Sequence, residues 1–167
     1  RYIFINQGFN LRPTDVQAAM GLNQFERLNK FINIRINNRN KIIKSLKKDP
    51  RWKNQYRFIQ VPKDIKPSFM GLPIFLNESM TKEIKMKLLF YLESKGIETR
   101  PILTGNFLNQ PSIKLFGLNN KKLKFKGAQS IEDLGFLIGL HTKEINQKQL
   151  NLIKNSFFFI DSLSKDI

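Results

Sequence analysis

Residues 8–25 read GFNLRPTDVQAAMGLNQF, a turn-forming segment followed directly by a helix-forming one. The glycine and the proline in its first half predict a loop. Thr14 and Gln17 then match a capping box, in which the threonine hydroxyl accepts a hydrogen bond from the third helical amide and the glutamine side chain reaches back to the cap. We therefore expect a helix to begin directly after Thr14.

This expected helix is long. Apolar residues recur along it, mostly three or four positions apart, at Val16, Ala19, Met20, Leu22, Phe25, Leu28, Ile32, Ile36, Ile43 and Leu46. Such spacing places an apolar stripe on one side of a helix. Asp49 and Pro50 are expected to end it near Lys48, because proline lacks the amide hydrogen that a helix needs. A helix of this length is typical of a connection between two parts of a protein or of a contact with a partner.

The rest of the chain alternates between short strands and helices. We expect strands at 57–61, 69–76, 97–103 and 136–140, helices at 81–95, 128–133 and 146–162, and one or two helical turns at 111–116. Residues 1–5 read as a further extended segment. This order predicts an α/β protein, more closely a small α+β domain: a mostly antiparallel sheet with helices on one face, entered by a long linking helix.

The net charge of the chain is strongly positive. Its 167 residues include 29 lysines and arginines against 13 acids, a formal charge of +16. A high positive charge can indicate nucleic-acid binding. Here the charge is spread along the chain without a nucleic-acid-binding motif, so basic helix faces or steering of an anionic substrate explain it. We expect no nucleic-acid partner, and a basic nucleic-acid-binding or interaction domain is kept as the remote alternative.

Several site classes are absent from the sequence. It has no cysteine, which excludes disulfides and thiolate metal sites and fits a cytoplasmic location. It carries no dinucleotide-binding glycine motif, phosphate-binding loop, H-E-x-x-H or G-x-S-x-G pattern. Its one histidine, His141, cannot form a multi-histidine metal site, and we expect no metal. No apolar run is long enough to span a bilayer, and the missing initiator methionine suggests a truncated product.

The opening segment resembles a family motif. Residues 8–25 are similar to the pattern G-[YF]-N-x-[RK]-x-[ST]-[DE]-x-Q-A-A-x-G-L-x-Q-L of the DegT/DnrJ/EryC1/StrS sugar aminotransferase family, with Phe25 in place of leucine. In that family of fold-type I enzymes the segment joins a large cofactor domain to a small C-terminal domain. The resemblance implies that residues 1–13 end the large domain, residues 14–48 link the two, and residues 49–167 form the small domain.

Later segments resemble one branch of that family. The matching residues are 67–74, 96–102, 105–107, 110–111 and 135–141. The branch contains 3-dehydratases of nucleotide-linked 4-keto-6-deoxyhexoses, of the GDP-4-keto-6-deoxymannose and CDP-4-keto-6-deoxyglucose type. Residues 104–106 read TGN, where most aminotransferases of the family carry a Y-x-P-L-H type segment. The resemblance therefore favours a dehydratase of surface-polysaccharide deoxysugar synthesis, such as that of lipopolysaccharide, and leaves a sugar aminotransferase as the alternative.

The resemblance also implies roles for five residues. Asn10 and Arg12 would bind the phosphate of pyridoxal 5'-phosphate or pyridoxamine 5'-phosphate in the partner subunit of a homodimer, because both donate hydrogen bonds and the cation offsets the phosphate charge. Arg100, Asn106 and His141 would bind the nucleotide-sugar substrate. The competing interpretation is a structural turn for Arg100 and Asn106 and a satisfied structural group for His141.

The family's decisive catalytic residue is expected outside this sequence. The cofactor-holding lysine of the aminotransferases, or the histidine that replaces it in the dehydratases, belongs to the large domain and would lie upstream. No catalytic residue is therefore assigned within the 167 residues. By itself, the chain is expected to be inactive and to bind the cofactor weakly or not at all.

Overall fold

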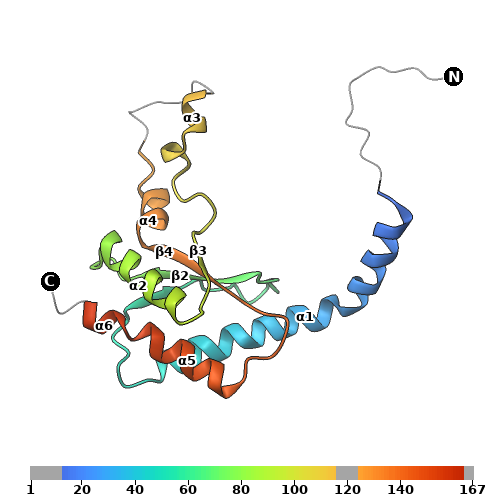
Figure 1. Cartoon of the computed structure of the whole chain (residues 1–167), viewed down its shortest axis with the longest axis horizontal. Helices are drawn as coiled ribbons and strands as arrows, with labels where there is room; N and C mark the ends of the chain where they lie inside the picture. The colour runs from blue at the N-terminus through green and yellow to red at the C-terminus, as the bar shows by residue number, and fades with distance from the viewer. Residues whose placement is uncertain (1–12, 116–123, 164–167) are drawn as a thin grey trace.

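The computed structural model describes residues 13–115 and 124–163, and a long helix leads into the rest of the fold (Figure 1). This helix, α1, spans Asp15–Lys47. The predicted capping box is confirmed: the Thr14 amide donates to Gln17 Oε1 (2.9 Å), and the Gln17 amide donates to Thr14 Oγ1 (3.3 Å). The helix ends two residues before Asp49, as expected.

The described elements form a four-stranded antiparallel sheet and a set of helices. The strands are β1 (Tyr56–Phe58), β2 (Gly71–Leu76), β3 (Thr99–Arg100) and β4 (Gly135–Gly139). The other helices are α2 (Lys82–Ser94), the 3-10 helix η1 (Phe107–Asn109), α3 (Ser112–Leu115), α4 (Lys126–Leu134), α5 (Gln147–Phe157) and α6 (Ile160–Leu163). The strand order is β1-β2-β4-β3, with every neighbouring pair antiparallel, which confirms the predicted fold class.

One face of the sheet carries the core. Alternate residues of β2 and β4 are buried there: Leu72, Ile74, Leu76, Phe136 and Ile138. Residues from the last turns of α1, from α2 and from α5 complete this cluster, including Ile42, Leu46, Ile84, Leu88, Leu92 and Phe157. Side chains alternate between the faces of a strand, so Pro73, Phe75 and Leu137 lie on the opposite face, where they are half-buried. The helices that close the core thus lie on a single face.

Three predicted strands are shorter in the structure, and the one expected at 69–76 loses only its first two residues, because β2 begins at Gly71. The strand expected at 97–103 is only Thr99–Arg100, because Pro101 lacks an amide hydrogen and Leu103 has a positive φ of 50°, which is incompatible with a strand. The strand expected at 57–61 stops at Phe58. The next carbonyl, that of Ile59, accepts a hydrogen bond from Arg39 Nη2 of α1 (2.6 Å) instead of joining a strand ladder.

The last helix is also interrupted. The sequence predicted one helix to about residue 162, but α5 ends at Phe157 and α6 begins at Ile160. The Phe157 carbonyl accepts a hydrogen bond from the buried Tyr56 hydroxyl (2.5 Å), and Phe158 is buried as well. Because two successive phenylalanines enter the core here, the backbone turns rather than continuing as one helix.

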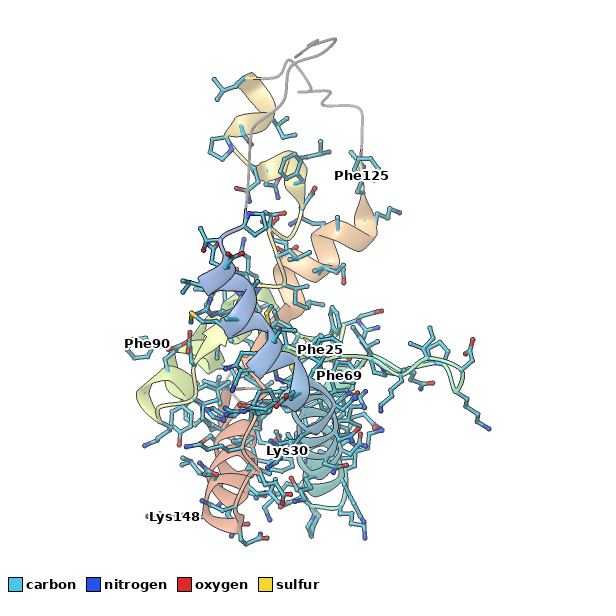
Figure 2. All side chains as sticks on the ribbon, turned by 90° about the vertical axis from the view of Figure 1, so that its right-hand side faces the viewer. Phe25, Lys30, Phe69, Phe90, Phe125 and Lys148 are labelled. Carbon is cyan, nitrogen blue, oxygen red and sulfur yellow. The ribbon has the colours of Figure 1, made fainter. Side chains whose placement is uncertain are left out.

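The first half of α1 lies away from the core (Figure 1, blue). Its apolar residues are exposed among the described residues: Val16, Met20, Leu22, Phe25 and Leu28. Phe25, labelled in Figure 2, is 71% exposed. Of the predicted apolar stripe, only Leu46 is fully buried. Ile43 is half-buried, and the neighbouring Ile42, which the predicted stripe did not include, enters the core instead.

An ion-pair cluster joins the end of α1 to α5. The Asp49 carboxylate, 7% exposed, accepts from Arg51 Nε (2.8 Å) and lies 3.4 Å from Lys154 Nζ. The hydrogen bonds from Arg51 hold the pKa of Asp49 well below its usual range. Arg51 also lies over the Phe158 ring, 4.3 Å from its centroid, so the cluster connects to the core.

The burial of α1 predicts two different responses to the same substitution. Leu46→Ala is expected to lower the free energy of unfolding by about 2–5 kcal/mol, because it opens a cavity in the core. Leu22→Ala, on the exposed half of the same helix, is expected to change it by less than about 0.5 kcal/mol. Urea unfolding of the 167-residue chain measures both. Equal effects would contradict this division of the helix.

The Asp49 cluster predicts a pH-dependent contribution. Asp49→Asn is expected to lower the free energy of unfolding by about 1–3 kcal/mol at neutral pH, through loss of charge-assisted hydrogen bonds. Because the pKa of Asp49 is lower in the folded chain, its contribution is complete above the unfolded value of about 3.9 and is lost as the pH falls through the folded value. Denaturation of both proteins across acidic pH should show their difference shrinking. A constant difference would argue against an electrostatic origin.

Candidate functional site

Arg100 lies on the edge strand β3, opposite Leu137 of β4. Its side chain is 74% exposed, and its Nη2 lies 2.7 Å from Glu98 Oε1. The guanidinium is therefore accessible to a ligand but already engaged by a carboxylate from its own segment. A ligand that uses Arg100 would bind beside this ion pair or compete with it.

Asn106 is buried and begins the 3-10 helix η1. Its Oδ1 accepts from the Leu108 amide (3.2 Å), and its Nδ2 donates to Gln129 Oε1 of α4 (3.0 Å). The backbone amide of Asn106 donates to Glu132 Oε2 (2.9 Å). These bonds give Asn106 a clear structural role in the turn, while a role toward the substrate stays a prediction.

The turn before Asn106 needs glycine. Gly105 has a φ of +64°, and a Cβ there would lie 2.8 Å from the Cβ of Glu132. The turn and α4 therefore approach each other so closely that a side chain at position 105 would clash. Of Gly105 and Asn106, only the glycine has a left-handed backbone conformation, because Asn106 has an ordinary φ of −82°.

Lys85 of α2 contacts the same region, at the end of α4. Its ammonium is buried and donates to the backbone carbonyls of Glu132 and Gly135, at the C-terminal end of α4. A cation at this position interacts favourably with the helix dipole. Burial lowers the pKa of Lys85. The prediction of sites missed this residue, although its spacing to Leu88 and Leu92 already placed it on the inward stripe of α2.

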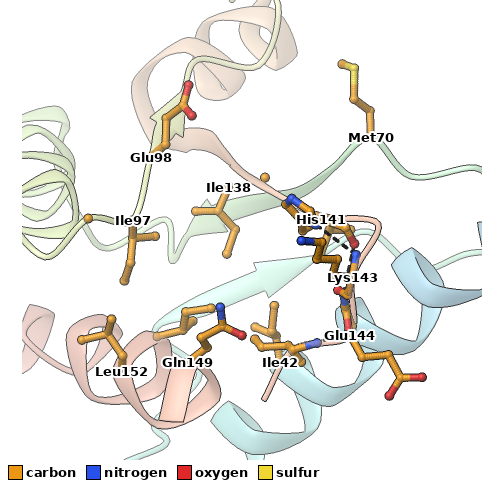
Figure 3. Close-up of a pocket in the computed structure, with 16 residues that line it drawn as sticks. Ile42, Met70, Ile97, Glu98, Ile138, His141, Lys143, Glu144, Gln149 and Leu152 are labelled. Atoms are coloured by element: carbon orange, nitrogen blue, oxygen red, sulfur yellow. Dashed lines mark hydrogen bonds between the residues drawn. The ribbon is translucent and has the colours of Figure 1, made fainter. Parts of the chain in front are cut away.

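His141 lies two residues beyond β4, at the rim of a cavity of about 560 Å³ (Figure 3). Its Nδ1 accepts a hydrogen bond from the Lys143 amide (2.9 Å). The backbone carbonyls of His141 and Lys143 accept from Asn38 Nδ2 of α1, at 3.1 and 2.8 Å. The imidazole is thus held on a turn that is itself anchored to the long helix.

The cavity has apolar walls and a polar rim. Its walls include Ile42, Ile97, Ile138, Leu152 and Ile153, and its rim includes Glu98, His141, Lys143, Glu144 and Gln149. Ligand pockets commonly combine such walls with a few polar groups and have volumes of about 300–1,000 Å³. The chemistry available at this rim is hydrogen bonding and charge pairing.

The three predicted substrate residues do not meet in one place. Asn106 contacts α4 just before β4 begins, and His141 follows the end of β4. At about 3.3 Å per residue this strand spans about 13 Å, with Arg100 beside its middle. Of the three, only His141 lines the cavity. Their binding roles therefore stay predictions.

The cofactor residues fall outside the described part. Asn10 and Arg12 both belong to residues 1–12, so their role stays a prediction. Within the described ranges, no group of three or more His, Asp or Glu side chains could hold a metal. No helix of the described part is long and apolar enough to span a membrane.

Curated relatives of this chain include deoxysugar enzymes. It is 27% identical over 143 residues to the GDP-4-keto-6-deoxy-D-mannose 3-dehydratase of Escherichia coli, covering 85% of this chain and 35% of the relative. It is 32% identical over 114 residues to the lipopolysaccharide biosynthesis protein RfbH of Salmonella typhimurium, covering 66% of this chain and 24% of the relative. The chain thus spans about a third or less of the length of these relatives.

Solved structures share the fold, and the sequence match defines the family. The E. coli dehydratase with bound hydrated PLP superimposes with a TM-score of 0.75 at 25% identity, covering 93% of this chain and 38% of that one. Spr1654 of Streptococcus pneumoniae, described as a sugar aminotransferase, reaches 0.78 at 16% identity, covering 99% and 40%, which shows a shared fold. Because residues 1–155 match its sequence profile, the chain belongs to the DegT/DnrJ/EryC1/StrS aminotransferase family.

Proposed function

We propose that this chain is the C-terminal part of a pyridoxal- or pyridoxamine-phosphate-dependent 3-dehydratase that acts on a nucleotide-linked 4-keto-6-deoxyhexose. One observation carries the choice of reaction. The dehydratase and Spr1654 match the fold equally well, with TM-scores of 0.75 and 0.78, but sequence identity is 25% to the former and 16% to the latter. Similarity in sequence beyond a shared fold therefore favours the dehydratase.

The biological setting follows from the relatives. One of them is named a lipopolysaccharide biosynthesis protein, and another is named a 3-dehydratase of a GDP-linked deoxysugar. We place this chain in deoxysugar synthesis for a surface polysaccharide, in the cytoplasm, where nucleotide sugars are made and consumed. The positive charge of the chain supports an anionic substrate, because it would attract a nucleotide sugar.

The domain assignment remains part of the proposal. Residues 1–13 would end the large domain, residues 14–48 would link, and residues 49–167 would form the small domain. A 33-residue helix is about 50 Å long, and only its last turns are buried in the described fold. The exposed apolar residues of its first half suit packing against another part of the enzyme.

The cofactor would be held mainly by residues beyond the described part. Asn10 and Arg12 would donate hydrogen bonds to its phosphate across a homodimer interface. In such an enzyme, the electron sink for loss of the 3-hydroxyl is supplied by the bound cofactor. The described residues would instead position the linking helix and contribute to substrate binding through Arg100, Asn106 and His141.

A sugar aminotransferase of the same family is the second candidate. The observation in its favour is the coverage: Spr1654 matches 99% of this chain with a TM-score of 0.78. Both reactions begin from a 4-keto sugar nucleotide and the same cofactor. They differ in whether the product loses the 3-hydroxyl or gains a 4-amino group.

The reaction itself separates the two candidates. The full-length protein with pyridoxamine 5'-phosphate, glutamate and GDP-4-keto-6-deoxymannose is expected to give a keto sugar without the 3-hydroxyl, identified by mass spectrometry and NMR. A reaction without the cofactor is the control, and the CDP-linked 4-keto-6-deoxyglucose tests the nucleotide preference. A stable 4-amino sugar would establish the aminotransferase instead.

The 167-residue chain alone is predicted to lack this activity. It should also take up little or no pyridoxal 5'-phosphate, because the cofactor-holding residue would belong to the large domain. Absorbance titration and equilibrium dialysis measure the uptake, with the full-length protein as the positive control. Stoichiometric uptake by the chain alone would contradict the assignment of the cofactor site.

A further inference from the structure

We propose that the turn carrying His141 and Lys143 binds an anionic phosphate oxygen at the rim of the cavity, and that Asn38 positions this turn. The identification of the ligand as the diphosphate of a nucleotide sugar rests on the proposed function. The geometry of the turn does not depend on the proposed function. It is described by the hydrogen bonds from α1 to the turn, the hydrogen bond within the turn, and the ion pairs around it.

Asn38 is the anchor. It is 3% exposed and uses both ends of its side-chain amide: Nδ2 donates to the carbonyls of His141 and Lys143, and Oδ1 accepts from the Ile145 amide (3.0 Å). One buried side chain therefore holds the backbone of the turn at three points. Removing a buried side chain whose hydrogen bonds are all formed lowers the free energy of unfolding more than removing an exposed one, because its buried partners lose their hydrogen bonds.

The turn orients the imidazole of His141. Because Nδ1 accepts from the Lys143 amide, the neutral ring carries its proton on Nε2. Within the described ranges, Nε2 has no hydrogen-bond partner, and the His141 side chain is exposed among the residues that line the cavity (Figure 3). His141 thus offers a hydrogen-bond donor to whatever occupies the cavity rim.

The charges at the rim leave one cation available. Glu98 pairs with Arg100 (2.7 Å), and Glu144 pairs with Lys41 (3.6 Å). Lys143 has no ion-pair partner in the described part of the chain, although it lines the same cavity. A donor from His141 beside an uncompensated ammonium suits an anionic oxygen, since charge-assisted hydrogen bonds are the strong ones.

The cavity gives this rim a second element of recognition. Its apolar walls, from Ile42, Ile97, Ile138 and Leu152, lie next to the polar turn. A ligand with a phosphate and a flat or apolar portion would use both. A nucleoside diphosphate has this composition, whereas inorganic phosphate would use the rim alone.

NMR of the 167-residue chain tests the geometry, because its one histidine gives one imidazole signal. Long-range proton–nitrogen correlation at mildly alkaline pH is expected to show the proton on Nε2. Titration with GDP and with inorganic pyrophosphate should shift this signal, and guanosine should shift it much less. A proton on Nδ1, or no greater shift with GDP than with guanosine, would overturn the proposal. The measurement needs no enzymatic activity, so it is independent of the reaction assay.

Matched substitutions test the residues. Lys143→Met is expected to weaken GDP binding about tenfold, as loss of one charge-assisted hydrogen bond would. Lys148→Met removes the same charge from an exposed position of α5 outside the cavity, and should leave binding within about twofold. Equal losses would show that the net charge alone attracts GDP and would overturn the site. Lys143 is exposed, so this pair tests the proposal without threatening the fold.

Asn38→Ala tests the positioning role against Asn37→Ala, its exposed neighbour. Asn38→Ala is expected to shift the imidazole toward a mixture of tautomers and to weaken GDP binding about tenfold, while Asn37→Ala should change neither. An unchanged tautomer in a folded Asn38→Ala protein would show that Asn38 does not position His141. Titration with pyridoxal 5'-phosphate distinguishes the phosphate source. If pyridoxal 5'-phosphate binds more tightly than GDP, the turn that carries His141 and Lys143 belongs to the cofactor site, and the nucleotide-sugar assignment is overturned.

Discussion

The described fold depends on the burial of the last turns of α1 against one face of the sheet. Ile42 and Leu46 enter the core beside β2, β4 and α5, and Asp49 at the helix end binds Arg51 and Lys154. Burial of each large aliphatic side chain contributes about 1.5–3 kcal/mol. This one contact sets the direction of the whole helix, and through Asn38 it also sets the turn after β4.

A second set of contacts uses polar groups instead of apolar ones. The lobe formed by η1 and α4 has few core residues and is held by hydrogen bonds that Asn106 donates to Gln129 and Glu132 and that Lys85 donates to Glu132. Buried polar groups must be paired, so each of these contacts requires its partners in place. The network holds the turn at Gly105 beside α4. In the sequence this turn comes shortly after Arg100, which lies on the edge strand β3.

The surfaces that the fold leaves exposed agree with the chain's membership in a family of larger proteins. The first half of α1 presents apolar residues without a partner in the described part, and the chain spans about a third of the length of the dehydratases it resembles. A long helix buried at one end and apolar at the other is suited to joining two domains. The substrate contacts proposed for Arg100, Asn106 and His141 would then be completed by other segments.

Local signals determined much of the structure. The capping box at Thr14, the proline after Asp49 and the alternating apolar residues of β2 act within a few residues, so the sequence alone predicted α1, the inner strand and the fold class. The motif at residues 8–25 likewise led to the family. Tertiary structure decided the rest, because it depends on partners far apart in the chain. Arg39 binds the carbonyl that directly follows β1, Tyr56 binds the carbonyl at the break in the last helix, and Asn38 binds the His141 turn from 103 residues away in the sequence. No local pattern encodes these long-range hydrogen bonds.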